Sequence, residues 1–373
     1  MARADSLRMR AGQIFCACDI DGLPLDLDTL PKDSSIVRMA FAFGASVLAQ
    51  VLTLSALPLA SASITLPLSH VPWPYLAMLL GAALAGFPAA LLIDRMGRRS
   101  AFALGASLGI AGGILSAWAM MARLPQPFII GVLWLGMAQG FGLFYRHAGA
   151  MAGGAGGLVF GAGSLGAIIG PFIIEAAQNI GGPLAPAYTL GVAGLAHLLT
   201  LALAVSLPAR IIEIETRDVE IQRPPLGRFL SATLLAAMAW FGMTGLMAQA
   251  PLAMIGCGLS FSLSAVAMAV HLAAMYLPGF MIGRLIIRLG ALNTAFLGVV
   301  LLGFGAMLLQ FQGNLAGFSL SLAIAGFGWG TATIGSTAMM HRAGRPSVHA
   351  LALHDISLFL AAMAGAALFG RLG

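Results

Sequence analysis

The feature that most constrains this fold is a series of long apolar runs that follow one another with few charged residues between them. The runs cover residues 36–60, 72–93, 100–122, 126–146, 150–178, 183–207, 227–248, 261–286, 291–311, 315–338 and 350–370. Each is near or above the roughly 20 residues that an α-helix needs to cross a bilayer. The runs are continuous, whereas the strands of a membrane barrel alternate apolar and polar residues. We therefore predict an all-α integral membrane protein with about eleven transmembrane helices.

The composition supports lipid as the solvent and argues against other classes. The chain is 60% hydrophobic, and only 9% of its residues are charged. The net charge of +6 could indicate nucleic-acid binding, but the basic residues occur singly or in small groups between apolar runs, not in one stripe. Cys16 and Cys18 form a lone Cys-x-Cys without a second pair, so neither a metal site nor a disulfide framework is predicted. We expect no cofactor and no nucleic-acid partner.

Two polar segments divide the chain. Residues 1–35 hold six acidic and four basic residues and no long apolar core, which predicts a polar cytoplasmic tail. Residues 208–226 form the longest internal loop and separate six apolar runs from five. We therefore expect an N-terminal six-helix lobe at 36–207 and a C-terminal lobe with five helices at 227–373.

The distribution of arginine predicts the orientation. The loops after the even-numbered runs, with their flanks, hold twelve arginines, whereas the loops after the odd-numbered runs hold only Arg123. Because basic loops stay in the cytoplasm, the even-numbered loops and the N-terminal tail are predicted to be cytoplasmic. With eleven crossings, the C-terminus is predicted to lie outside the inner membrane.

A charged turn lies between the second and third apolar runs and has a counterpart in the second half. The turn holds Asp94, Arg95, Gly97, Arg98 and Arg99. Residues 86–105 match residues 279–298 at eight of twenty positions, and Arg95 and Gly97 then align with Arg288 and Gly290. The match is typical of a transporter built from two internal repeats.

The same turn resembles the loop motif of the major facilitator superfamily, Gly-x-x-x-Asp-Arg-x-Gly-Arg-Arg/Lys, with Ala90 in place of the first glycine. A second resemblance lies in the fifth run, which has the Gly-x8-Gly-x3-Gly-Pro spacing of antiporters in that superfamily. Its residues are Gly157, Gly166, Gly170 and Pro171. The resemblance implies a two-lobed helical bundle, of which this chain lacks the usual twelfth span.

The resemblance also implies roles for particular residues. Asp94 is expected to face the N-terminus of the eleventh span, where Ser347 is a suitable N-cap. This contact and its neighbours would form a cytoplasmic gate, whose residues are Asp94, Arg95, Gly97, Arg98, Arg99 and Arg288. The first, fourth, seventh and tenth spans would line the substrate cavity. The expected cavity residues are Gln50, Gln139, Tyr145, Arg146, Trp240, Gln249, His271 and Trp329.

Ionisable residues inside spans are candidates for proton coupling because they are costly in lipid. The candidates are Glu175, His271 and Asp355. Each has a structural alternative: Glu175 could reach outer water, His271 could be a neutral hydrogen-bonded residue, and Asp355 could pair with an arginine. Arg146 could bind an anionic substrate or simply follow the rule for basic loops.

The segment GAGSLG at 161–166 matches the dinucleotide fingerprint Gly-x-Gly-x-x-Gly. It lies inside a continuous apolar run instead of following a strand, so helix packing by glycine is the better interpretation. No Walker loop is present, and an enzymatic function is not expected.

The sequence therefore predicts a secondary transporter that moves a small organic solute by alternating access. We expect exchange or export, protons as the coupling ion, and a monomer in the bilayer. The alternative is a transporter-like protein that acts as a sensor or assembly factor without transport.

Overall fold

The computed structural model describes residues 34–64, 73–151, 155–209, 221–222, 224–342 and 344–369. The predicted tail therefore lies outside the described residues except for Ser34 and Ser35, which begin the first helix. Most of the predicted inter-lobe loop also lies outside them.

The first lobe consists of helices. An apolar segment in lipid folds as a helix because its backbone N–H and C=O groups must form hydrogen bonds within the segment. The helices are α1 (Ser34–Ser63), α2 (Trp73–Met121), α3 (Pro125–Leu143), α4 (Tyr145–Met151), α5 (Gly156–Gly161), α6 (Gly163–Gly181), the short 3₁₀ helix η3 (Gly182–Leu184) and α7 (Ala185–Val205). Proline occupies the first turn of α3 and of α7, where its missing N–H removes no intrahelical bond.

The second lobe follows the same plan. It contains α9 (Leu226–Gly256), α10 (Phe261–Tyr276), η5 (Leu277–Phe280), α11 (Ile282–Leu289), α12 (Ala291–Leu309), α13 (Leu315–His341) and α14 (Val348–Phe369). The side chains of Ser260 and Asn314 accept backbone N–H bonds at the starts of α10 and α13, as N-cap residues do.

The number of crossings agrees with the sequence prediction. Within the described residues, nine helical stretches are long and apolar enough to span a membrane. Two of them, at 73–121 and 156–205, have 49 and 50 residues, and each is therefore more than twice the length of one crossing. Gly97 in the first (φ 84°) and Gly182 in the second (φ 49°) leave the helical conformation. Each stretch thus makes two crossings, which gives eleven.

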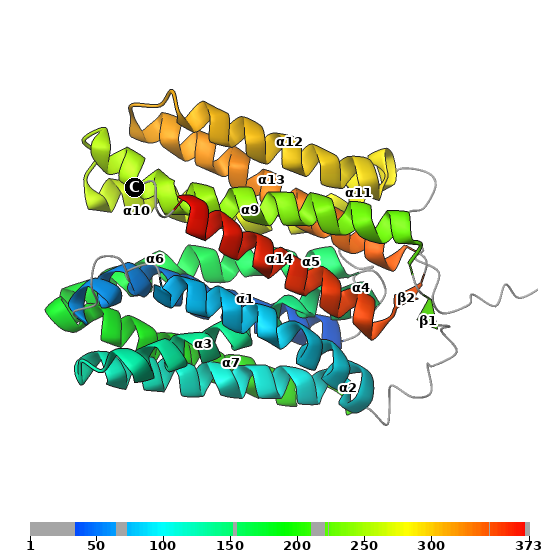
Figure 1. Cartoon of the computed structure of the whole chain (residues 1–373), viewed down its shortest axis with the longest axis horizontal. Coiled ribbons are helices and arrows are strands. Elements are labelled where there is room, and N and C mark those ends of the chain that lie inside the picture. Colours follow the sequence, from blue (N-terminus) through cyan, green and yellow to red (C-terminus); the bar gives the residue numbers. More distant parts are fainter. Residues whose placement is uncertain are drawn as a thin grey trace, which may run out of the picture.

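The helices run side by side in two lobes, with α14 packed between them (Figure 1). The β1–β2 pair and α11 lie at one end of the bundle, at the right of Figure 1. The ion pair between Asp94 of α2 and Arg345 of β2 places the Gly97 turn at the same end. Among the described residues this end also carries Arg95, Arg288 and Arg345, and we call it the basic end. The last described turn of α14 lies at the opposite end.

A small strand pair lies at the basic end. β1 (Ile221–Gln222) pairs in parallel with β2 (Arg345–Pro346), with Ile221 opposite Arg345. The sequence suggested only a loop at 208–226, because two residues are too few to show strand periodicity. The pair attaches the inter-lobe segment to the residues that precede α14.

The two sequence repeats have the same backbone conformation at their turns. Gly97 has φ 84° and ψ 168°, and Gly290 has φ 79° and ψ 156°. This region is accessible essentially only to glycine. The agreement supports the alignment of the two halves that the sequence indicated.

Candidate functional site

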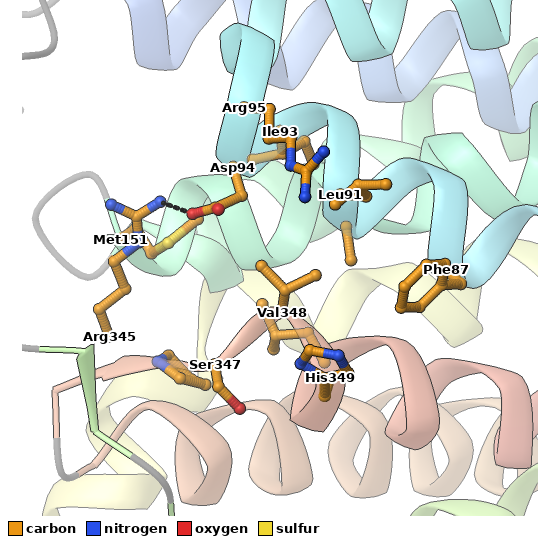
Figure 2. A pocket seen from close by; sticks show the side chains of 13 residues that line it. Phe87, Leu91, Ile93, Asp94, Arg95, Met151, Arg345, Ser347, Val348 and His349 are labelled. Atoms are coloured by element: carbon orange, nitrogen blue, oxygen red, sulfur yellow. Dashed lines mark hydrogen bonds and ion pairs between the residues drawn. The ribbon is translucent and has the colours of Figure 1, made fainter.

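An ion pair joins the two lobes at the basic end. Arg345 Nη2 donates to Asp94 Oδ1 at 3.1 Å, with side-chain exposures of 25% and 32%. The Gly97 turn holds Asp94 at the end of the first crossing of α2, and β2 holds Arg345 just before α14. Figure 2 shows the two side chains facing one another across the gap between the lobes.

The contact differs in one respect from the sequence expectation. Asp94 does face the start of α14, and it forms an ion pair there with the side chain of Arg345. The Ser347 hydroxyl accepts from the backbone N–H of Ala350 at 3.3 Å, so Ser347 is the N-cap as expected. Sequence reasoning treated Arg345 only as an orientation signal, because its distance from Asp94 along the chain hides the pairing.

The other residues of the expected gate have different positions. Arg95 lines a cavity of about 450 Å³ beside the ion pair, and Arg98 Nη1 lies 3.8 Å from Met39 Sδ of α1. Arg99 is exposed, as is Arg288 at the end of α11. These arginines are at the basic end but only Arg95 borders the gap between α2 and α14.

A second, very small cavity lies near the middle of the bundle. It has a volume of about 20 Å³. Its lining residues are Phe43, Ser46, Val47, Gln50, Gln139, Gly142, Leu143, Trp240, Tyr276 and Trp329. Both lobes contribute, and four of the residues expected from the sequence are among them: Gln50, Gln139, Trp240 and Trp329.

Aromatic rings fill the space around this cavity. Trp240 and Trp329 have ring centroids 5.1 Å apart, and Tyr276 lies edge-on to Trp329 at 5.9 Å. From the first lobe, Phe43 contacts Tyr276 at 5.9 Å. The cavity is therefore closed by aromatic contacts between the lobes.

Several polar atoms around the closed cavity are buried without a hydrogen-bond partner among the described residues. On the residues that line the cavity these atoms are Gln139 Oε1, Trp240 Nε1 and Trp329 Nε1. A buried polar group without a partner costs free energy, and such groups are found where a ligand or water binds.

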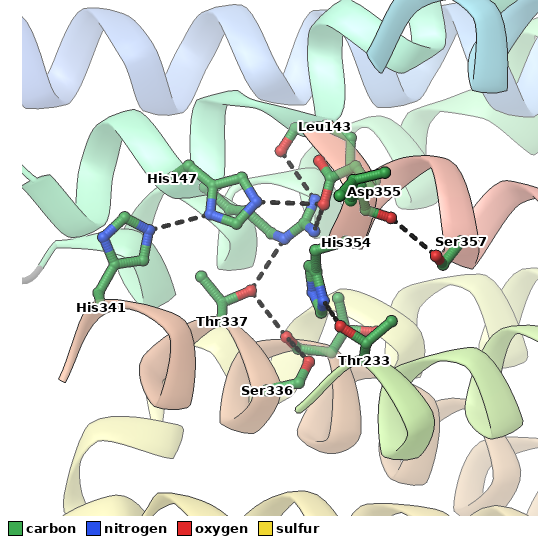
Figure 3. Close-up of polar contacts among 12 residues, drawn as sticks. Leu143, His147, Thr233, Ser336, Thr337, His341, His354, Asp355 and Ser357 are labelled. Atoms are coloured by element: carbon green, nitrogen blue, oxygen red, sulfur yellow. Dashed lines mark hydrogen bonds and ion pairs between the residues drawn. The ribbon is translucent and has the colours of Figure 1, made fainter. Parts of the chain in front are cut away.

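A buried network lies between the lobes, and we call it the inter-lobe cluster: Arg146 and His147 of α4, Thr337 and His341 of α13, and Asp355 of α14 (Figure 3). Arg146 Nη2 donates to Asp355 Oδ1 at 2.6 Å, and both side chains are fully buried. Arg146 also donates to Thr337 Oγ1 at 2.9 Å and to the Leu143 carbonyl at 3.0 Å.

The two histidines of the cluster continue its hydrogen-bond network. His147 Nε2 lies 3.2 Å from Asp355 Oδ1, and His147 Nδ1 lies 3.0 Å from His341 Nε2. The sequence suggested pairing of Asp355 with an arginine as one alternative, and the structure shows this pair. Sequence reasoning missed the roles of His147 and His341, although an ionisable residue within or at the end of a span is the signal that would have marked them.

The remaining candidate residues lie elsewhere. His271 Nδ1 is 2.7 Å from the Leu322 carbonyl, so it joins α10 to α13 within the second lobe. Glu175 is exposed on α6, and Gln249 donates to the Phe369 carbonyl at 3.4 Å. Tyr145 is buried beside the cavity and stacks on Phe102 with ring centroids 3.7 Å apart.

The glycine motif of the fifth span has two different contacts. A side-chain carbon at Gly166 or Gly170 would collide with α1, at Gly44 or at Val51, so these residues pack one lobe together. Pro171 follows within α6. A carbon at Gly157 would lie 2.7 Å from the Gly279 carbonyl of η5, so this position is a close contact between the lobes.

Fold and site together define a two-lobed helical membrane transporter. A family model described as the Major Facilitator Superfamily matches residues 39–366. The chain therefore belongs to the major facilitator superfamily.

Related proteins agree with this assignment. The chain is 32% identical to the riboflavin transporter RfnT of Brucella anthropi, over 84% of this chain and 82% of that protein. It is 27% identical to YddS, an uncharacterised transporter of the same type in Bacillus subtilis, over 78% and 73% of the two chains. A solved structure of the E. coli xylose transporter XylE, partially occluded and inward open, superposes with a TM-score of 0.69 at 14% identity and covers 91% of this chain and 92% of its own. That likeness concerns the fold.

Proposed function

We propose that this protein is a secondary transporter of a flat, uncharged heteroaromatic solute, with riboflavin as the first candidate. The observation that carries the proposal is the pair of neighbouring tryptophans, Trp240 and Trp329, whose rings lie at 55° to one another in the lining of the closed central cavity. Flat aromatic solutes gain affinity by stacking on such rings.

The unpartnered polar atoms support the same class of solute. Trp240 Nε1 and Trp329 Nε1 are donors, whereas Gln139 Oε1 is an acceptor, and all three are buried beside the cavity. An isoalloxazine ring carries both carbonyl acceptors and an imide N–H donor at its edge. A ligand with both kinds of group would satisfy the protein atoms that are unpaired when the cavity is closed.

The charge of the cavity argues for an uncharged solute. The ten described residues that line it include no charged side chain. Arg146, the expected candidate for binding an anion, already donates to Asp355, Thr337 and Leu143. It therefore has little capacity left for an anionic group.

The size of the cavity indicates a closed conformation. Its volume of about 20 Å³ is far below the roughly 300–1,000 Å³ of typical ligand pockets. Binding then requires the lobes to separate, as alternating access describes. The relationship to a riboflavin transporter supports the choice of solute, at 32% identity.

The test is uptake of riboflavin by proteoliposomes, followed by its intrinsic fluorescence, together with binding measured by quenching in detergent. We expect saturable uptake, and we expect Trp240→Leu and Trp329→Leu each to weaken binding about tenfold through lost stacking. Trp118→Leu is the matched control, because Trp118 is 49% exposed on the outer face of α2.

Flavin mononucleotide, which adds a phosphate to the same ring, should bind poorly to the uncharged cavity. Absence of riboflavin binding, with the protein folded, would refute the proposed solute. Saturable binding without any uptake would favour a sensor or assembly factor over a transporter.

A further inference from the structure

The small central cavity has two chemically different walls, one on each lobe. We propose that the second lobe holds the ring of the solute, and that Gln50 and Gln139 of the first lobe bind a hydroxylated chain carried by that ring. These two amides then determine which ring-bearing solutes the protein accepts. The inference rests on the proposed function and adds a second recognition element to it.

The residues that line the cavity divide by type between the lobes. The second lobe contributes three aromatic residues, which are Trp240, Tyr276 and Trp329. The carboxamides and the serine of the described lining belong to the first lobe, and they are Ser46, Gln50 and Gln139. The first lobe adds one ring, that of Phe43, which lies about two helical turns from Gln50 along α1. A solute between the lobes therefore meets tryptophan rings on one side and amides on the other.

The polar wall follows the contact between α1 and α3. Ser46 and Gln50 are four positions apart on α1, and Gln139 and Gly142 are three positions apart on α3, so each pair shares one face of its helix. A side-chain carbon at Gly142 would lie 2.5 Å from Ser46 Oγ, so the two helices touch at this level.

The direction of the helices brings the two amides together. As the first and fourth crossings, α1 and α3 run in opposite directions. Gln50 follows Ser46 on α1, whereas Gln139 precedes Gly142 on α3. Both amides therefore lie about one helical turn further from the basic end than the Ser46–Gly142 contact. They form a neighbouring pair in the lining of the cavity.

One of these amides has an unsatisfied polar atom. Gln139 Oε1 is buried without a hydrogen-bond partner among the described residues, and such a group costs free energy unless a ligand or water binds it. A hydroxyl both donates and accepts hydrogen bonds, so a row of hydroxyls can satisfy the oxygen and the NH₂ group of each amide. A carboxylate only accepts and would leave Gln139 Oε1 unpaired. The chemistry of the wall therefore favours a neutral, hydroxylated chain.

The aromatic wall is held together within the second lobe. The ring centroids of Trp240 and Trp329 are 5.1 Å apart, and Trp240 lies edge-on to Phe359 of α14 at 5.0 Å. The contact between Ser46 and Gly142 likewise lies within the first lobe. Because none of these contacts crosses the lobe boundary, each wall keeps its shape when the lobes separate. The indole N–H groups of the two tryptophans, which are buried and unpaired, are then available to the carbonyl groups of the ring.

Two flavins that differ only in the chain test the division of the site. Riboflavin carries a ribityl chain on its isoalloxazine ring, and lumiflavin carries a methyl group in the same place. Binding of each to the purified wild-type protein in detergent is measured by the quenching of flavin fluorescence. We expect riboflavin to bind at least about tenfold more tightly, because lumiflavin leaves a buried amide without a partner. Equal affinities for the two flavins would overturn the proposal.

Substitution of the amides tests the assignment of the polar wall. We expect Gln139→Leu to weaken riboflavin binding at least about tenfold and to leave lumiflavin binding unchanged, and Gln50→Leu to act in the same direction. Unchanged lumiflavin binding also shows that a variant is folded. If the amides only pack α1 against α3, both flavins will lose affinity equally, and that result would refute their role in recognition. The wild-type comparison needs no variant, so it decides even where a variant does not fold.

Substitution of a ring tests the other wall. Trp329→Leu should weaken both flavins by the same factor and so keep the preference for riboflavin. A loss of this preference in Trp329→Leu, together with its retention in Gln139→Leu, would refute the division between the lobes.

Gln312→Leu is the matched control. Gln312 is a partly buried glutamine that donates to the Leu308 carbonyl at 2.9 Å and is absent from the described lining of the cavity. We expect it to leave both affinities unchanged. If neither flavin binds to the folded protein, the proposed solute is refuted, and this inference with it. If both flavins bind with equal affinity, the aromatic solute stands and only the divided site is refuted.

Discussion

Asp94 of α2 and Arg345 of β2 form a partly exposed ion pair at 3.1 Å although they are 251 positions apart. The pair joins the two lobes at the end where the Gly97 turn, β1 and β2 meet. A second ion pair, between Arg146 and Asp355, joins the same lobes and is fully buried. The contacts that join the lobes at the basic end therefore include one ion pair that is accessible to water and one that is not.

Neutralising the exposed pair should favour opening at the basic end. We expect Asp94→Asn to shift the population toward the form open at that end by up to about fivefold, because partly exposed pairs contribute about 0.2–1 kcal/mol. Labelling of single cysteines from each side of the membrane measures the shift. Arg345→Gln should have the same effect, whereas Arg123→Gln, an exposed change at the opposite end, should have none. Unchanged labelling in both variants of the pair would exclude a role in the gate.

The backbone contact between Gly157 and Gly279 gives a second prediction. A side-chain carbon at either residue would collide with the carbonyl oxygen of the other. We expect Gly157→Ala and Gly279→Ala to prevent full closure of the basic end, which labelling would report as increased access there. Gly283→Ala is the control, since nothing lies within 4 Å of the added carbon. Normal closure in the first two variants would show that this contact does not limit the approach of the lobes.

The two turn glycines should be equally sensitive to substitution. Gly97 and Gly290 both have a positive φ with an extended ψ, so alanine at either should cost about 1–3 kcal/mol of stability. At Gly290 the added carbon meets no atom within 4 Å, so the cost there is conformational. Thermal unfolding in detergent measures it. Gly303→Ala, in α12 and equally free of neighbours, should be neutral or stabilising, and a similar loss at all three sites would contradict the explanation.

The orientation remains a prediction that a reporter fusion can check. Eleven crossings from a cytoplasmic N-terminus place the end of the chain outside, as the arginine distribution indicates. Alkaline phosphatase fused after Gly373 should be active, and green fluorescent protein at the same position should be dark. Strong fluorescence without phosphatase activity would require an even number of crossings or the opposite orientation.

Much of the fold could be predicted because lipid imposes a simple rule on sequence. A long apolar run must be a helix, and the eleven predicted runs match helices of the structure, with ends that differ by several residues in α9 and near α4. The turn glycines could also be predicted, because a repeated motif placed Gly97 and Gly290 at equivalent positions. The aromatic and amide residues of the central cavity were predicted in part: Gln50, Gln139, Trp240 and Trp329 line it.

The partners of these residues could not be predicted. Asp355 was a candidate by its type alone, but its contacts with Arg146 and His147 join positions 209 and 208 residues apart. Glu175 and His271 were candidates for the same reason. The structure places Glu175 on an exposed face of α6 and His271 in a contact within the second lobe. Helical periodicity gives little help in choosing among them, because a uniformly apolar helix has no distinct buried face.

The sequence by itself determined the helices, their order and the positions of the turns, since each depends on local hydrophobicity, on arginine at helix ends or on the backbone freedom of glycine. Only the tertiary structure decided which charges meet across the lobes, which polar atoms surround the closed cavity and which histidines connect to Asp355. These contacts depend on the rotation and depth of helices far apart in the chain, and these quantities are set by side-chain packing between helices.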